Sequence, residues 1–257
     1  MTKSIPEPLW QHLLASFPFL AERSDADLAH LRELSLGFLA KKEFHGAGGL
    51  AITDPMALAI AAQACLPLVH LGPSIKALAW YDDFVGIVVH PGEMIARRQM
   101  QDALGVHHDN SEVIAGEAMH GGPVTLNWHD VADARQSARH GSNLVIHEFA
   151  HKLDMRDGVA NGCPPLPSGF MGAKTASVGH RIWQTAMQSE YAKFCEQIAL
   201  HQRFGADAPW LDAYAATSPP EFFAVACEAY FVNRAFFARD FAALVPLFDA
   251  FFKPPGV

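Results

Sequence analysis

The stretch from Ser142 to Leu153, SNLVIHEFAHKL, constrains the fold more than any other part of the sequence. It has the pattern of a helix that is apolar over most of its circumference, and such a helix lies in the interior between other elements. Its polar positions recur at helical spacing and share one side of the helix: Asn143, His147, His151 and Asp154. Buried polar groups need partners, and one cation facing this stripe would satisfy several of them.

Within this helix, residues 147–151 read His-Glu-Phe-Ala-His, the H-E-x-x-H pattern of zinc metalloproteases. Residues four apart lie one above the other on a helix, so His147 and His151 can reach a single ion. Neutral imidazole is a good ligand for zinc, and Glu148 lies about 100° around the helix, where it can contact a metal-bound water. The alternative is a pair of core histidines bonded to backbone carbonyls. We favour the metal site, with one Zn²⁺ per chain.

A zinc site needs a third protein ligand, and the sequence offers two candidates. Asp157 stands where the third ligand of an HExxHxxGxxH pattern would fall, but Asp154 replaces the turn glycine of that pattern. Glu221 begins a segment that is apolar nearly all round, where a carboxylate is costly unless a cation meets it. Yet Ser218-x-x-Glu221 is also a capping box, with Pro219 in the first turn. These residues alone leave Glu221 open as a ligand or as a cap.

The order of elements along the chain predicts an α+β fold dominated by helices, with a small sheet. Helices are expected first, then a few strands, and then helices again. The expected helices cover residues 8–40 (two helices), 53–66, 142–153, 180–203 and 218–237, and the expected strands cover 84–89 and 123–128. The segment Val124–Trp128 is either a sheet edge that pairs with an extended peptide or an ordinary internal strand. The C-terminal phenylalanines are expected in the core: Phe236, Phe237, Phe241, Phe248, Phe251 and Phe252.

Composition disfavours some classes of binding partner and indicates a cellular compartment. Lys and Arg number 19 against 27 Asp and Glu, a net charge of −8, which disfavours direct binding to nucleic acid or to acidic membranes. The most apolar run, Pro55–Leu71, is interrupted by Gln63, Pro67 and His70, so we expect no membrane span. The first residues do not have the pattern of a secretory signal, and the four cysteines are far apart. We therefore expect a cytoplasmic protein with free thiols.

Three segments carry a resemblance to a known family: GPVTLNW (Gly122–Trp128), NLVIHEFAHKLD (Asn143–Asp154) and DAYAATSPPEFFAVACEAYF (Asp212–Phe231). Together they resemble the Mlc titration factor A family of bacterial zinc peptidases. The resemblance implies a zincin-like metallopeptidase fold with a gluzincin-like site similar to that of the catalytic domain of anthrax lethal factor. We expect a single zinc peptidase domain over residues 1–257, with an N-terminal helical lobe over 1–80 and a catalytic core over 81–257.

The same resemblance assigns roles to residues of this chain. It implies that His147, His151 and Glu221 bind the zinc, that Glu148 is the general base, and that Tyr214 donates a hydrogen bond to the oxyanion. The alternative for Tyr214 is packing beneath the turn that precedes Glu221. The implied activity is aminopeptidase-like hydrolysis of a peptide or protein substrate, linked to the regulation of sugar uptake. The alternative function is a regulatory protein that sequesters a DNA-binding repressor of the Mlc type. The presence of Glu148 favours the enzyme, because a purely structural metal site needs no base.

Overall fold

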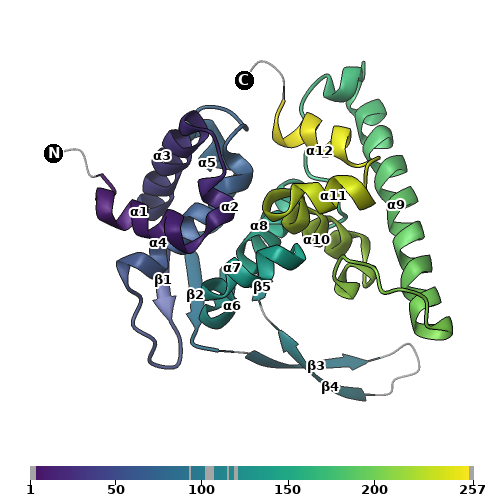
Figure 1. Ribbon diagram of the computed structural model, residues 1–257, viewed down its shortest axis with the longest axis horizontal. Helices are drawn as coiled ribbons and strands as arrows, with labels where there is room; N and C mark the ends of the chain where they lie inside the picture. Colours follow the sequence, from purple (N-terminus) through teal and green to yellow (C-terminus); the bar gives the residue numbers. More distant parts are fainter. Residues whose placement is uncertain (1–3, 93, 102–106, 115, 119–120, 255–257) are drawn as a thin grey trace.

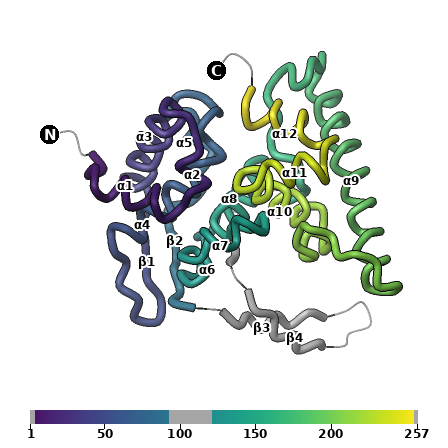
Figure 2. Tube along the Cα trace, in the orientation of Figure 1, coloured from purple at the N-terminus to yellow at the C-terminus, as the bar shows by residue number. Residues whose placement is uncertain are grey.

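The computed structural model describes residues 4–92, 94–101, 107–114, 116–118 and 121–254. A group of helices formed by the N-terminal part of the chain lies at one side of the molecule (Figures 1 and 2). Ser24 and Thr53 cap two of these helices by accepting hydrogen bonds from the backbone N–H groups of Asp27 and Met56. The helices of this group are α1 (Glu7–Ser16), α2 (Pro18–Ala21), α3 (Asp25–Lys41), α4 (Asp54–Cys65) and α5 (Ser74–Leu78).

A four-stranded sheet has the order β1-β2-β6-β5. Its strands are β1 (Glu43–Gly46), β2 (Gly86–His90), β6 (Val124–Asn127) and β5 (Gly116–Ala118). β1, β2 and β6 are parallel, and β5 runs antiparallel to β6. Because β6 pairs on both sides, the predicted strand at Val124–Trp128 is internal, and the interpretation of it as a sheet edge was wrong. β5, which pairs with β6, is the terminal strand on that side of the sheet. A separate antiparallel pair consists of β3 (Met94–Gln101) and β4 (His107–Ile114).

The helix that carries the H-E-x-x-H motif, α8 (Leu144–Asp154), contacts α4 on one side and α10 on the other. α9 to α12 form the opposite side of the molecule (Figure 1). The remaining helices are α6 (Trp128–Ala132), α7 (Ala134–Ser137), α9 (Ala176–Phe204), α10 (Pro219–Val232), α11 (Arg234–Asp240) and α12 (Val245–Phe252). Short 3-10 turns are η1 (Leu66–Leu68), η2 (Ala79–Tyr81), η3 (Ala138–His140), η4 (Met155–Asp157), η5 (Phe170–Gly172) and η6 (Ala213–Ala216).

These elements confirm the predicted α+β class, helix-dominated with a small sheet. Two expected helices differ in their limits. Residues 8–40 contain an extra short helix, α2, because the backbone of Phe17 leaves the helical region before Pro18. The helix expected from 218 to 237 ends at Val232, because Asn233 has an extended φ of −147°, and α11 begins at Arg234.

Aromatic side chains pack α8 into the interior. Phe149 is fully buried, and its ring contacts those of Phe38, Tyr81 and Phe84. The buried apolar side chains form one contiguous cluster that includes residues from both sides of position 80. All the C-terminal phenylalanines expected in the core are buried except Phe236, which is 39% exposed and stacks on Trp210. The division of the chain near residue 80 stays a prediction.

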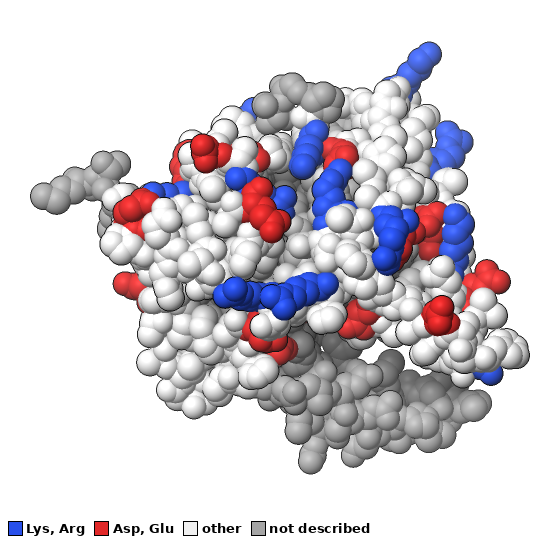
Figure 3. Space-filling model, in the orientation of Figure 1, with Lys and Arg blue, Asp and Glu red and all other residues white. Residues whose placement is uncertain are grey.

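Among the residues that the structure describes, no helix has the length and apolar character needed to cross a lipid bilayer. Acidic and basic side chains are interspersed over the face shown in Figure 3. The cysteines are free thiols, as expected from their spacing: Cys65, Cys163, Cys195 and Cys227.

Candidate metal centre

The two ends of the polar stripe on α8 are bound by the protein itself. Asn143 caps the helix, because its Oδ1 accepts a hydrogen bond of 2.9 Å from the backbone N–H of Ile146. At the other end, the carboxylate of Asp154 accepts hydrogen bonds of 2.8 Å from the N–H groups of Gly162 and Cys163. Burial raises the pKa of Asp154 to about 6, although these two hydrogen bonds act to lower it. Asp154 therefore holds the loop that follows α8, and the two histidines between the ends remain for a ligand.

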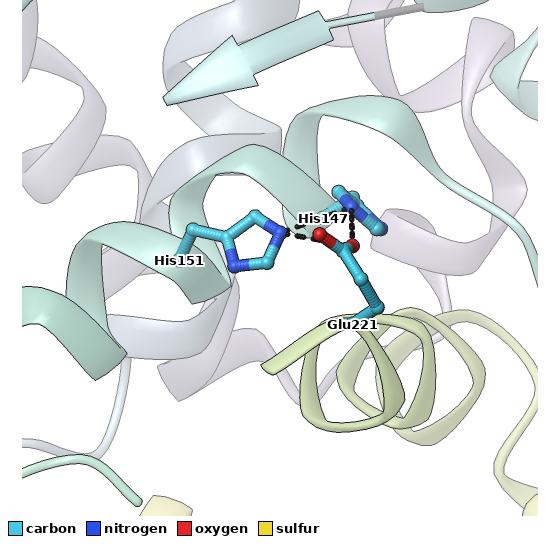
Figure 4. Close-up of side chains that lie close together, drawn as sticks. All are labelled: His147, His151 and Glu221. Carbon is cyan, nitrogen blue, oxygen red and sulfur yellow. Dashed lines mark hydrogen bonds and ion pairs between the residues drawn. The ribbon is translucent and has the colours of Figure 1, made fainter. Parts of the chain in front are cut away.

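His147, His151 and Glu221 come together from two helices, α8 and α10 (Figure 4). The Nε2 atoms of the two imidazoles are 3.2 Å apart, and each also lies close to Oε2 of Glu221, at 3.1 Å from His147 and 3.2 Å from His151. The side chains are 12% exposed for both histidines and 20% for Glu221. Three donor atoms thus converge at a site that is largely shielded from solvent, although each side chain keeps some exposure.

The spacing and chemistry of these donors fit a zinc ion. Ligand atoms that each lie about 2.0–2.1 Å from a tetrahedral ion are separated by about 3.3 Å. The observed separations of 3.1–3.2 Å agree with that value. Two imidazoles and one carboxylate also form a donor set of catalytic zinc sites, which keep a fourth position for water or substrate. Among the described residues, this is the group of His, Cys, Asp and Glu side chains able to hold a metal ion.

The charges of Glu221 and His147 support one another. Burial raises the pKa of Glu221, but hydrogen bonds with His147 and His151 outweigh it and lower that pKa to about 2. Burial lowers the pKa of His147, yet hydrogen bonds with Glu221 and Glu228 raise it well above its usual value. The carboxylate is therefore ionised, as a metal ligand must be. A bound cation would replace the proton between His147 and Glu221.

A second carboxylate, Glu228, fixes the orientation of His147. Its Oε1 lies 2.7 Å from Nδ1 of His147, on the side of the ring that faces away from Glu221. Its Oε2 accepts hydrogen bonds from Oγ of Ser142, at 3.0 Å, and from the backbone N–H of Asn143. Nδ1 of His147 donates to this carboxylate, which leaves Nε2 for a metal. Glu228 follows Glu221 by seven residues, which puts both side chains on the same face of α10, but this spacing does not identify the partner of Glu228.

The structure separates the two candidates for the third ligand. Asp157 is exposed in the turn after α8, where its Oδ1 accepts a hydrogen bond of 3.2 Å from the N–H of Val159, and it lies outside the cluster. Ser218 Oγ accepts from the backbone N–H of Glu221, at 3.4 Å, while the Glu221 side chain reaches the histidines. The hydroxyl of Ser218 therefore caps α10, and the carboxylate of Glu221 lies at the histidines instead.

Glu148 and Tyr214 lie at the same site. Glu148 is only 3% exposed on α8, next to His147. The ring of Tyr214 lies 6.0 Å from that of His147, and its side chain is 52% exposed, so it is not packed beneath the turn. The Tyr214 backbone N–H donates to Oδ1 of Asp212, which caps η6. The ring of Tyr214 thus lies beside His147 with about half of its side chain exposed.

The segment that carries Tyr214 is anchored on both sides. Trp210 stacks on Phe236 and lies against Gly141, where a Cβ atom would come within 2.4 Å of its ring. Gly141 also has a φ of +76°, which favours glycine. On the other side, the hydroxyl of Tyr191 donates a hydrogen bond of 3.0 Å to the backbone carbonyl of Ala216. Sequence reasoning found no signal for these anchors, because they join residues far apart in the chain.

Comparison with known families shows which family the chain belongs to. The sequence model of the glucose-regulated metallo-peptidase M90 family matches residues 1–253, nearly the whole chain. The chain belongs to the M90 metallopeptidase family. This confirms the resemblance found in the sequence, and it agrees with the group of two histidines and a glutamate at the centre of the molecule.

Relatives in the M90 family are similar over almost their full length. Mlc titration factor A of Klebsiella pneumoniae is 33% identical over 245 residues, which cover 95% of this chain and 85% of the relative. The protein of the same name from Salmonella arizonae is 32% identical over 246 residues, covering 95% and 90%. That from Cronobacter sakazakii is 34% identical over 244 residues, covering 95% and 84%.

Proposed function

We propose that this chain is a zinc-dependent peptidase with aminopeptidase-like activity. One observation carries the proposal: His147 and His151 of α8 and Glu221 of α10 bring three metal-binding atoms within about 3 Å of one another. Glu148 lies on the same helix as the two histidines, as a hydrolytic site requires. The membership in a metallopeptidase family supports hydrolysis of peptide bonds.

In this proposal His147, His151 and Glu221 hold one Zn²⁺, which, when bound, polarises the substrate carbonyl and lowers the pKa of a bound water toward ~7. Glu148 accepts a proton as a water molecule attacks the carbonyl carbon of the scissile bond. It then donates the proton to the leaving amine as the C–N bond breaks. Tyr214 donates a hydrogen bond from its hydroxyl to the oxygen that becomes negative.

The sheet offers a place for an extended peptide. β5 is one of the two terminal strands of the four-stranded sheet, the other being β1, and it contacts α8. Backbone N–H and C=O groups on the outer side of a terminal strand can pair with a substrate strand. We propose that the peptide lies along β5, with its scissile bond beside the histidines. β6 is excluded from this role because both its edges are paired.

A second proposed function is the binding of a transcriptional repressor. The relatives bear the name Mlc titration factor A, and they share about a third of their residues with this chain. We propose that a repressor of the Mlc type is a protein partner of this chain in the cytoplasm, in addition to peptide substrates. Binding of the partner needs a surface but no general base, so loss of Glu148 should leave it intact.

Metal analysis of the purified protein, alongside hydrolysis of peptides with free and with acetylated N-termini, tests the proposed peptidase. We expect about one zinc per chain and cleavage of the free peptide in preference to its acetylated form. Equal cleavage of both peptides would contradict the aminopeptidase-like assignment, and a chain that binds no zinc would contradict the proposal as a whole.

Replacing Tyr214 with phenylalanine should lower kcat by about 10²–10³, the usual effect of losing one oxyanion donor. The ring stays in place, so zinc content and the melting temperature should barely change. KM should also change little, because the hydroxyl acts mainly on the transition state. Steady-state kinetics on a peptide, with zinc measured in the same preparation, checks this. Wild-type kcat at full zinc content would exclude Tyr214 from the reaction.

A further inference from the structure

A buried amide in the N-terminal helices is hydrogen-bonded to the helix that carries the histidines. Gln63 lies on α4, where the other buried side chains are apolar, and it is fully buried. Its Nε2 donates a hydrogen bond of 3.0 Å to the backbone carbonyl of Ala59. Its Oε1 accepts a hydrogen bond of 2.7 Å from Nδ2 of Asn143. An apolar side chain would fill this position at lower cost, so packing alone does not account for glutamine here.

Asn143 connects this amide to the candidate metal centre. Its Oδ1 caps α8 at Ile146, while its backbone N–H donates to Oε2 of Glu228. The other oxygen of Glu228 accepts from Nδ1 of His147. The backbone carbonyl of Asn143 also accepts a hydrogen bond of 3.0 Å from the N–H of His147. One residue therefore fixes the start of α8, the carboxylate behind His147 and the backbone of His147.

The hydrogen bonds from Ile146 through Asn143 and Gln63 to Ala59 form a series with a backbone group at each end. These two backbone groups fix the direction of each hydrogen bond in the series. The N–H of Ile146 can only donate, so Asn143 must present Oδ1 to it and Nδ2 to Gln63. Gln63 must then present Oε1 to Asn143. Its Nε2 faces the carbonyl of Ala59, which can only accept. The two amides hence have a single orientation that satisfies all of these groups.

We propose that Gln63 is a positioning residue of the metal centre, which holds Asn143 and, through it, Glu228 and His147 in the orientation that binds zinc. This inference rests on the proposed zinc site. Gln63 itself does not touch the metal or the substrate. It acts by removing the freedom of Asn143, so that Oε2 of Glu228 keeps its two donors and Nε2 of His147 stays directed at Glu221.

Zinc affinity of Gln63→Met, measured by competition with a chromogenic chelator, tests the proposal without any assay of activity. Methionine keeps the length and volume of the side chain but leaves Nδ2 of Asn143 without its acceptor. We expect zinc to bind about ten-fold more weakly, the lower end of the effect of partners that orient a metal ligand. The visible spectrum of the cobalt-loaded variant should shift as well, because the geometry at His147 changes.

Two further variants separate positioning from a merely structural role. Thr53→Ala removes the cap of the same helix, α4, without touching α8, so it should lower the melting temperature and leave zinc affinity within about two-fold of wild type. Gln63→Glu should restore zinc affinity. A buried neutral carboxyl group can accept from Asn143 with its carbonyl oxygen and donate its proton to Ala59.

The results of these experiments distinguish a failure of the inference about Gln63 from a failure of the proposed zinc site. If Gln63→Met binds zinc as tightly as wild type, Gln63 is not a positioning residue, while the zinc site stands. If Thr53→Ala weakens zinc binding as much as Gln63→Met, the effect is one of stability and the proposal is overturned. If the wild-type chain binds no zinc, both fail. If Gln63→Met does not fold, Gln63→Asn replaces it in the experiment. Asparagine is polar but one methylene too short to reach Asn143, so we expect the same loss of zinc affinity.

Discussion

Replacing Glu148 with glutamine should reduce peptide hydrolysis by about 10²–10⁴ or more while the protein keeps its zinc. General acid–base groups contribute rate enhancements of this size, and the amide cannot accept the proton of the attacking water. Glu148 is 3% exposed, so a side chain of the same shape should keep the packing of α8. Turnover on a peptide and the zinc content of the same preparation measure the two effects together.

The control for this variant is binding of the proposed repressor partner. Retained binding at lost turnover would separate the enzyme from the regulatory function. Turnover near that of wild type, with zinc present, would contradict the role of Glu148 as the base. It would favour the alternative in which this chain is a binding protein whose metal is incidental.

Removal of a proposed ligand should cost more zinc affinity than removal of any residue behind it. His147→Ala should bring zinc content near zero, and Glu221→Ala should weaken zinc binding by more than the roughly 10–100-fold typical of outer partners. Alanine at 221 keeps the backbone N–H that Ser218 caps, so α10 should still begin at the same residue. Zinc content after dialysis and the zinc dissociation constant are the measurements.

Asp157→Ala is the matched control, because Asp157 is the other acidic candidate from the sequence and lies in an exposed turn outside the cluster. It should keep full zinc affinity. The assignment of the third ligand is wrong if Glu221→Ala retains zinc and Asp157→Ala loses it.

Much of this site follows from local spacing. The i, i+4 relation of His147 and His151 needs only a helix, and the apolar residues around them predict that this helix is buried. Glu221 is different, because its distance from the histidines depends on how α8 and α10 pack. Residue spacing alone left it open as a cap, and the family resemblance favoured it as a ligand.

The parts of the site that sequence reasoning missed are contacts between distant segments. Glu228 lies 81 residues from His147 in sequence, and Gln63 lies 80 residues from Asn143. No periodicity relates such pairs, since each depends on the packing of one helix against another. Gln63 was noted in the sequence only as an interruption of an apolar run, although a polar residue in such a run requires a partner.

The sequence predicts the fold class and the long helices. It does not predict the short elements or those that depend on contacts between distant segments. The helices at residues 53–66 and 142–153 were found because caps and apolar periodicity coincide there. β1 and β5 are only four and three residues long, and β1 pairs with a strand that is distant in sequence, β2. Whether a strand is internal or terminal also depends on its neighbours, which is why the sequence left both alternatives open for β6.

Titration of the metal-free protein with zinc, with peptide hydrolysis measured at each addition, tests the central claim most directly. If His147, His151 and Glu221 form one zinc site that drives hydrolysis, the rate should rise in proportion to added zinc and level off at one equivalent per chain. Full hydrolysis by the metal-free protein, or zinc binding at one equivalent that brings no hydrolysis of any peptide, would contradict the claim.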